Sequence, residues 1–224
     1  MIRIMICAVL FLAACSGGRE TSYDQAHETR AYINIFREAG EEATAVPALT
    51  PEFIDSLTTP TLEATVERFG QVALLAPYSE RADASAGALR VWRAGDGTQL
   101  IFRSGVLVAT RGLGNDLGST LSDAAVDAIQ SRQPVSGLHR LYVKNGEHGI
   151  SQITLHCEMR VIGEEQKQSV PSPQNAIHMQ SVCSGFTGTI TYDYWLEPGD
   201  STVWRSRQWA GPELGYIRTR LLKK

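Results

Sequence analysis

The stretch GVLVATRGLGNDLG, residues 105–118, places three glycines between an apolar run and a helix-like run, where a nucleotide-binding protein would bind phosphate. Gly112, Gly114 and Gly118 are spaced G-x-G-x-x-x-G, one residue longer than the dinucleotide fingerprint, and no Lys-Ser or Lys-Thr follows as in a P-loop. The acidic residue that would bind a ribose about twenty residues later is also missing. The sequence therefore predicts no nucleotide cofactor, and no other cofactor is expected.

The same loop residues suit a tight exit from a strand. Gly112 and Gly114 permit positive φ where the chain must turn sharply. Asp116 can accept hydrogen bonds from backbone N–H groups in the turn, while Leu113 and Leu117 can enter the core. The sequence favours this structural role, with a loop that binds a sugar or a partner as the alternative.

No catalytic site is predicted. The chain contains no G-x-S-x-G elbow and no H-E-x-x-H helix. A glycoside hydrolase would need two carboxylates a few ångströms apart in a cleft, and the sequence gives no pairing for Asp116, Asp193 or Glu197. We therefore expect a protein that is not an enzyme.

Two cysteines in the second half of the chain raise the question of a metal site. His156 precedes Cys157, and His178 lies five residues before Cys183, but neighbours on a strand point to opposite faces and cannot ligate one ion together. No metal is therefore expected. A hairpin centred on Val170 would place the two cysteines directly opposite each other, which predicts a disulfide in an exported protein. Two buried free thiols are the alternative.

Aromatic residues near the C-terminus offer the main argument for a ligand. Their faces can stack on the C–H faces of sugar rings, and Trp195 and Trp209 are the candidate glycan contacts. Ile190, Tyr192, Tyr194 and Leu196 share one strand face, which favours the core for them. Trp195 falls on the opposite face and is the aromatic side chain that we expect first to be exposed.

The N-terminus has the layout of a cleaved secretory signal, with one positive charge at Arg3, an apolar stretch and small residues at its end. Its last residues, Leu-Ala-Ala-Cys at 12–15, resemble the bacterial lipobox, which implies a signal peptide over residues 1–14 and lipidation of Cys15. The alternative is an ordinary signal peptide with a chance cysteine. Several acyl chains would give stable membrane anchoring. Because Ser16 replaces the Asp of inner-membrane retention, we expect an outer-membrane protein on the periplasmic side.

Composition limits the partners. The 224 residues include 21 basic and 24 acidic side chains, a formal net charge of −3, and loss of Arg3 with the signal makes it −4. This balance does not favour nucleic acid. The membrane, reached through the lipid anchor, is an expected partner, and polysaccharide or export-machinery proteins are possible ones.

The pattern of elements predicts a lipidated tether over residues 15–24 and one β-rich domain over residues 25–224 with an N-terminal helical segment. Helices are expected over residues 25–42, 50–57 and 119–130, the last capped by Ser119 or Thr120. The predicted strands, separated by glycine turns, cover residues 62–69, 71–76, 88–93, 98–102, 106–110 and much of 139–222. Strand-rich runs with short connections indicate a mainly β fold: an antiparallel curved sheet, barrel or sandwich with one or two packed helices.

Three segments carry a family resemblance. They read WRAGDG at 92–97, VLVATRGLGNDL at 106–117 and RQWAGP at 207–212. They resemble the YjbF/GfcB family of lipoproteins associated with exopolysaccharide and group 4 capsule, from about Leu49 to the C-terminus. The resemblance implies a lipoprotein of polysaccharide export or assembly, with no family active site to carry over.

Two functions are therefore open. The first is a non-enzymatic lipoprotein of exopolysaccharide or capsule secretion or assembly. The second is a periplasmic carrier that binds lipid or lipoprotein on a curved β-sheet. A sustained apolar lining on the concave face would favour the carrier, whereas exposed Trp and Tyr beside Arg, Asp and Asn would favour the glycan.

Overall fold

Strands make up most of the described residues, as the sequence predicts. The computed structural model describes residues 20–22, 47–144, 149–167, 174–186 and 188–224. In chain order the elements are β1 (Glu20–Ser22), α2 (Pro51–Ser56), β2 (Thr61–Val66), β3 (Gln71–Arg81), β4 (Leu89–Ala94), β5 (Gln99–Arg103), β6 (Val106–Arg111), β7 (Leu117–Leu121), α3 (Asp123–Ser131), β8 (Val135–Lys144), β9 (Ile150–Lys167), β10 (Gln174–Gly185), β11 (Gly188–Leu196), β12 (Val203–Trp209) and β13 (Tyr216–Lys223).

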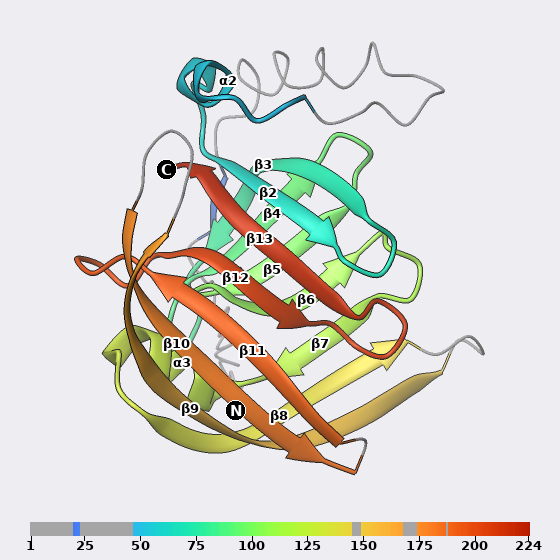
Figure 1. The fold of residues 1–224 in the computed structure, drawn as a ribbon. Helices are drawn as coiled ribbons and strands as arrows, with labels where there is room; N and C mark the ends of the chain where they lie inside the picture. The colour runs from blue at the N-terminus through green and yellow to red at the C-terminus, as the bar shows by residue number, and fades with distance from the viewer. Residues whose placement is uncertain (1–19, 23–46, 145–148, 168–173, 187) are drawn as a thin grey trace, which may run out of the picture.

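The long strands form one antiparallel sheet that curls into a nearly closed barrel (Figure 1). Paired neighbours follow the order β6-β5-β4-β3-β2-β13-β12-β11-β10-β9-β8-β7, and β1 pairs with β3 off this path. The two ends of the order, β6 and β7, contact each other, but no strand pairing joins them within the described ranges. This confirms the mainly β fold and leaves a seam between β6 and β7.

The core fills the inside of the barrel because apolar residues alternate along the strands. On β11, Ile190, Tyr192, Tyr194 and Leu196 all face inward and are at most 8% exposed, as the alternation predicts. The inward side chains of the other strands join them in one large cluster.

The two described helices differ in how well the sequence places them. In α2, the Thr50 hydroxyl accepts a hydrogen bond from Phe53 N at 3.2 Å, which confirms the expected cap. The predicted helix over 119–130 is wrong at its start, because residues 117–121 pair with β8 as strand β7. Helix α3 begins after Ser122, so neither Ser119 nor Thr120 is its cap.

The barrel has two distinct ends. One, which we call the mouth end, carries α2, the C-terminus and the connections 82–88 and 197–202. The helix α2 and the C-terminus are seen at the upper left of Figure 1. The opposite end carries the short hairpins, among them residues 67–70 and 210–215. Strand β1 pairs with the mouth half of β3, where Glu20 is opposite Arg81.

Part of the sequence prediction falls on other residues. The signal peptide over 1–14, Cys15 and the helix over 25–42 lie outside the described residues, as does most of the tether over 15–24. Within the described part of the chain, no helix has the length and apolar character needed to span a bilayer.

Candidate functional site

The glycine loop between β6 and β7 is organised by one buried carboxylate. Asp116, 5% exposed, accepts hydrogen bonds from Gly112 N at 3.0 Å, Leu113 N at 3.1 Å and the Thr110 hydroxyl at 2.8 Å. Gly112 and Gly114 have φ of 86° and 85°, the left-handed region expected for them. The contacts of this loop are those of the predicted strand exit.

The loop also joins the two strands at the seam. Thr110 Oγ1 accepts from Leu117 N at 2.9 Å, and the Arg111 guanidinium donates to the carbonyls of Leu117 and Gly118, both at 3.3 Å. Side chains therefore supply contacts between β6 and β7 where a strand ladder is not formed.

Gln208 contacts β6, one of the two strands at the seam, and sequence reasoning missed it. From β12 its Oε1 accepts from Leu107 N at 2.8 Å, and its Nε2 donates to Gly105 O at 2.8 Å. The side-chain amide thus satisfies one donor and one acceptor of the edge strand β6. The signal in the sequence was the RQWAGP segment, which contains Gln208.

A disulfide joins Cys157 on β9 to Cys183 on β10, in the register expected of a hairpin centred on Val170. The hairpin turn itself lies outside the described residues. Beyond the cysteines, a bulge between His178 and Met179 shifts the register by one residue. Both sulfurs are bonded to each other, so neither is a metal ligand.

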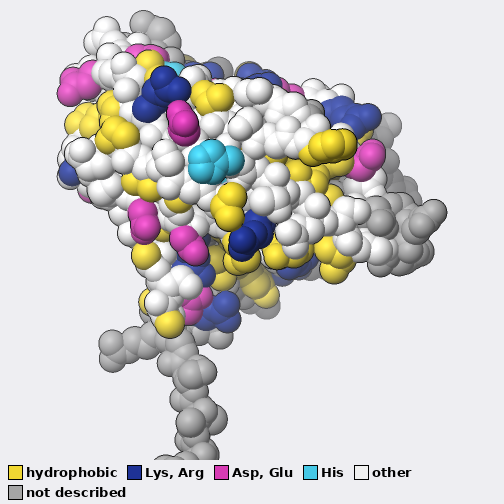
Figure 2. All heavy atoms as spheres, turned by 90° about the horizontal axis from the view of Figure 1, so that it is seen from below, with side chains coloured by type: hydrophobic (Ala, Val, Ile, Leu, Met, Phe, Trp, Pro, Cys, Tyr) yellow, Lys and Arg dark blue, Asp and Glu magenta, His cyan; other side chains and the backbone are white. Residues whose placement is uncertain are grey.

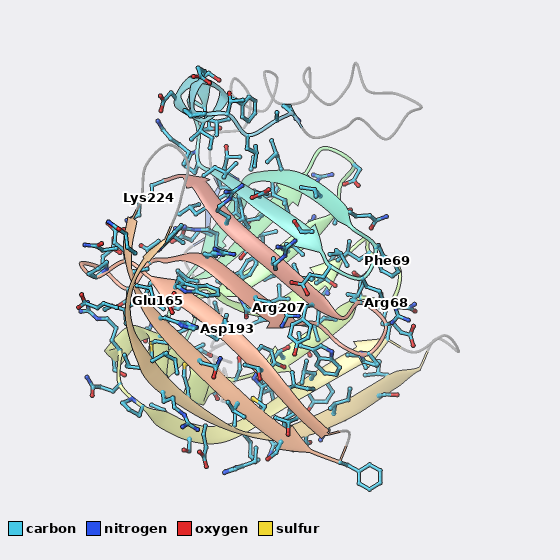
Figure 3. The ribbon with its side chains drawn as sticks, viewed as in Figure 1. Arg68, Phe69, Glu165, Asp193, Arg207 and Lys224 are labelled. Atoms are coloured by element: carbon cyan, nitrogen blue, oxygen red, sulfur yellow. A yellow bond between two sulfur atoms is a disulfide. The ribbon has the colours of Figure 1, made fainter. Side chains whose placement is uncertain are left out.

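The outer face of β9, β10 and β11 carries a cluster built on His178, which contacts Glu165 and Asp193. These two carboxylates are labelled in Figure 3. Its Nδ1 lies 2.8 Å from Glu165 Oε1 and its Nε2 lies 2.9 Å from Asp193 Oδ1. Because carboxylates only accept, both contacts are hydrogen bonds when the imidazole is doubly protonated. The cluster therefore links three neighbouring strands through the side chains of Glu165, His178 and Asp193.

Trp195 belongs to this cluster and corrects an expectation. It lies on the face opposite Tyr194, as predicted, but it is only 9% exposed. The imidazole of His178 stacks on its indole at 4.7 Å, and the Arg205 guanidinium lies 5.0 Å from the ring centroid. Its neighbours on β10 and β12 cover the ring, so the predicted exposure is wrong.

Charged pairs continue along the same outer face. Arg207 donates to Glu67 at 2.9 and 2.7 Å, and Arg218 lies 3.1 Å from the same carboxylate. The hydrogen bonds from Arg207 lower the pKa of Glu67. Arg207 also lies 3.4 Å from the Tyr216 ring centroid. These contacts brace the sheet between β2, β12 and β13.

The carboxylates considered for catalysis are placed apart. Asp116 is in the seam loop, Asp193 contacts His178, and Glu197 forms an ion pair with Lys224 at the mouth end. Across the described ranges, His, Cys, Asp and Glu side chains do not gather into a group of three able to hold a metal ion. Trp209, the other predicted glycan contact, is half-buried against the main core.

A pocket of about 310 Å³ is present at the mouth end, between the barrel wall and α3. We call it the mouth pocket. Its lining includes apolar groups, among them Trp92, Phe102 and Ile129, and polar groups, among them Arg90 and Asp200. It is the strongest candidate for a ligand site, and sequence reasoning did not identify it because its walls come from six separate elements.

Among the residues that the structure describes, exposed apolar side chains do not define a second site. The face seen in Figure 2 shows them in several separate groups between acidic and basic side chains. The most exposed are Ile150 at 70% and Phe186 in the hairpin between β10 and β11. Single exposed apolar residues are normal on protein surfaces.

Comparison with known proteins agrees with the fold and the sequence segments. The crystal structure of the hypothetical lipoprotein YmcC from Escherichia coli (K12) matches with a TM-score of 0.68 and 16% identity, over 86% of this chain and 95% of that one. Curated proteins give no significant match. The family model "Group 4 capsule polysaccharide lipoprotein gfcB, YjbF" matches residues 33–222. With most of its length matched, the chain belongs to the YjbF family of group 4 capsule polysaccharide lipoproteins.

Proposed function

We propose that this protein is an outer-membrane lipoprotein that takes part in exopolysaccharide or capsule secretion or assembly, without making or breaking glycosidic bonds. The observation that carries the proposal is the family match over residues 33–222. The lipobox-like residues 12–15 support the membrane anchor.

The contacts of the carboxylates support a non-enzymatic role. A glycosidase places two carboxyl groups on either side of the sugar bond, about 5 to 10 Å apart. Asp116 is occupied by backbone and hydroxyl donors inside the seam loop, and Glu197 is paired with Lys224. Asp193 and Glu165 are close to each other, but His178 fills the space between them.

The packing of the barrel favours the secretion role over a lipid carrier. A carrier needs an interior cavity lined by apolar groups, whereas Tyr192, Tyr194 and Leu155 project into this barrel and are at most 2% exposed. The lining of the mouth pocket includes the charged side chains of Arg90 and Asp200, so it is not the sustained apolar surface that a lipid carrier would need.

Gene deletion tests the proposal. We expect the deletion to reduce surface polymer and the wild-type gene to restore it. Purified protein should leave the chain length of that polymer unchanged over a long incubation. Unchanged polymer in the deletion strain would refute the secretion role, and steady release of reducing ends would refute the non-enzymatic role.

A further inference from the structure

Strand β11 has a free edge over the half that lies away from the mouth end. On one side, its nine residues pair with β10 in a continuous register. On the other side, only residues 193–196 pair with β12, and Figure 1 shows β11 extending beyond the point where β12 ends. Among the described strands, residues 188–192 therefore have a neighbour on one side only.

Backbone hydrogen-bonding groups point outward from this edge. Thr191 N donates to the hydroxyl of Tyr216, on β13, at 3.4 Å, which is long for a hydrogen bond. In an antiparallel strand the N–H and C=O groups of every second residue point to the same side, so those of Thr189 share this direction. One side-chain hydroxyl is a poor substitute for a neighbouring strand, which would pair with every backbone group of the edge.

This edge lacks the usual protection against pairing with other chains. Residues 188–192 read GTITY, without charge or proline, and their pairing with β10 contains no bulge. The edge of β6 is different, because Gln208 occupies its backbone groups. The part of β9 beyond β8 also differs, because it carries Arg160, Glu164 and a bulge. The edge of β11 is therefore the least protected of the three.

The surroundings of the edge favour a single extended segment over a second copy of the chain. The hairpin of β12 and β13, where Trp209 pairs with Tyr216, lies across from the edge. A copy of β11 would bring its own neighbour β10 with it, so it would need room for two strands between β11 and this hairpin. One extended peptide needs room for one strand, and it would displace the Tyr216 hydroxyl from Thr191 N.

Charges beside the edge favour acidic side chains in that segment. On the outer face, Arg207 and Arg218 are directly opposite each other and share one carboxylate, that of Glu67. The side chain of Arg218 is 51% exposed. Asp193, opposite Arg207 on β11, is bonded to His178. Two guanidinium groups that share one carboxylate leave positive charge beside the edge, and an acidic side chain would complement it.

The other face of the same segment would meet the core. Ile190 and Tyr192, on the edge itself, point inward and are at most 8% exposed. Because successive residues of a strand point to opposite faces, a segment that suits both faces alternates apolar with acidic residues.

We propose that residues 188–192 of β11 bind an extended segment of another polypeptide, in which acidic side chains alternate with small apolar ones. The segment pairs with Thr189 and Thr191 through backbone hydrogen bonds, in the manner of an added strand. This inference goes beyond the proposed function and does not depend on it, since it concerns peptide binding by the purified chain.

The probe is a fluorescently labelled peptide, Val-Asp-Val-Asp-Val-Asp-Val with blocked ends, and the protein is the mature membrane-extracted chain in detergent. Fluorescence polarisation measures affinity, and hydrogen exchange measures the protection of β11. We expect binding that slows exchange in residues 188–192. The same peptide with Lys in place of Asp should bind at least tenfold more weakly. The acidic peptide with methylated backbone nitrogens should not bind, because its hydrogen-bond donors are lost.

Two variants at one position separate backbone pairing from side-chain contact. Thr189→Pro removes an N–H group from the free edge, and because this group does not face β10, the ladder with β10 keeps its hydrogen bonds. Thr189→Val changes the side chain and keeps the N–H group. We expect Thr189→Pro to bind the acidic peptide at least tenfold more weakly and Thr189→Val to bind it like wild type, with similar melting temperatures.

Arg218→Gln tests the charge and remains informative if Thr189→Pro does not fold. We expect it to reduce the preference for the acidic peptide over the lysine peptide at least threefold. Arg160→Gln is the control, because Arg160 is an exposed arginine on β9. It should keep the wild-type preference.

The remaining outcomes overturn the inference. Failure of wild-type protein to bind the acidic peptide would do so, and so would equal binding by Thr189→Pro and Thr189→Val. A wild-type dimer in native mass spectrometry that Thr189→Pro converts to a monomer would assign the edge to a second copy instead. In each of these cases, loss of surface polymer on gene deletion would leave the proposed function in place.

Discussion

At the scale of single residues, Asp116 shows how a short polar side chain fixes a turn. It is buried, and its two oxygens receive the donors of Gly112, Leu113 and Thr110. A buried acceptor with several donors cannot be removed without leaving those donors unpaired, which costs about 1–3 kcal/mol each. The conformation of the loop therefore depends on this carboxylate.

We expect Asp116→Ala to lower the free energy of unfolding by about 3 kcal/mol, because two backbone N–H groups and one hydroxyl lose their acceptor. Denaturant titration measures the change. Asn115→Ala, at the exposed neighbouring position, is the control and should change stability by less than about 0.5 kcal/mol. Equal stability of the two variants would contradict the role assigned to Asp116.

A second effect of a single residue is the dependence of stability on pH through His139. Burial lowers the pKa of His139 to about 4, and its ring stacks on Tyr192 at 5.0 Å. The unfolded chain binds this proton near pH 6.5, so the contribution of His139 to stability is complete above that pH and is lost as pH falls toward 4. The size of this contribution is about 3 kcal/mol.

We expect His139→Phe to flatten the fall in unfolding free energy between pH 6.5 and pH 4, measured by denaturant titration at several pH values. His156→Gln, on the exposed face of β9, should keep the wild-type slope. An identical slope in His139→Phe and wild type would show that other groups cause the acid sensitivity.

At the scale of elements, the seam between β6 and β7 differs from the other strand contacts of the barrel, because side chains replace a strand ladder there. Gln208 reaches β6 from β12 and pairs with Leu107 N and Gly105 O. The amide of a glutamine carries the same donor and acceptor as a peptide group, so it substitutes for a missing neighbouring strand. When a side chain binds the free backbone groups of an edge strand, that strand is protected from pairing with other chains.

We expect Gln208→Leu to destabilise the protein by about 3 kcal/mol and to speed hydrogen exchange in β6, since Leu107 N and Gly105 O are left without a partner. Exchange followed by mass spectrometry locates the effect. Gln152→Leu, an exposed glutamine on β9, is the control. Faster exchange over the whole barrel, without a larger change in β6, would argue against a local bridge.

The sequence predicts these elements where signals are local. The turns around Gly95–Gly97 and Ser104–Gly105 separate the strands of the first meander as expected. The helix after the glycine loop was placed too early, because Ser119 and Thr120 look like caps while their pairing with β8 is a tertiary effect. Polar residues of this type suit both a cap and a strand.

The contacts of the candidate site are harder to predict than the strands, because they join residues that are far apart in the sequence. Gln208 and Leu107 are 101 residues apart in the chain, and no short motif encodes such a contact. The alternation of residues gives the face of the strand on which Trp195 lies, and this face led to the expectation that Trp195 is exposed. It does not reveal that His178 and Arg205 cover the ring. The disulfide was predictable because one hairpin register brings both cysteines together.

At the scale of the whole molecule, the expected lipid anchor on Cys15 would hold the barrel at a membrane surface. We expect intact-mass measurement of the membrane fraction to show a diacylglycerol adduct on Cys15 and Cys15→Ala to abolish it, because residues 12–15 resemble a lipobox. Cys7→Ala, inside the expected signal peptide, is the control and should leave the adduct in place. An unmodified mature chain in the membrane fraction would contradict the anchor.

The pairing of β1 with β3 limits the length of the segment that would link the barrel to a lipid anchor on Cys15. Glu20 is opposite Arg81 at the mouth end, and five residue steps separate it from Cys15. An extended chain covers at most about 3.5 Å per step, so an anchored cysteine lies within about 17 Å of that end. If Cys15 carries the expected lipid anchor, the mouth end of the barrel stays within that distance of the membrane surface. It would then sample a thin layer of periplasm along the membrane surface, and a polymer would reach it only by passing through that layer.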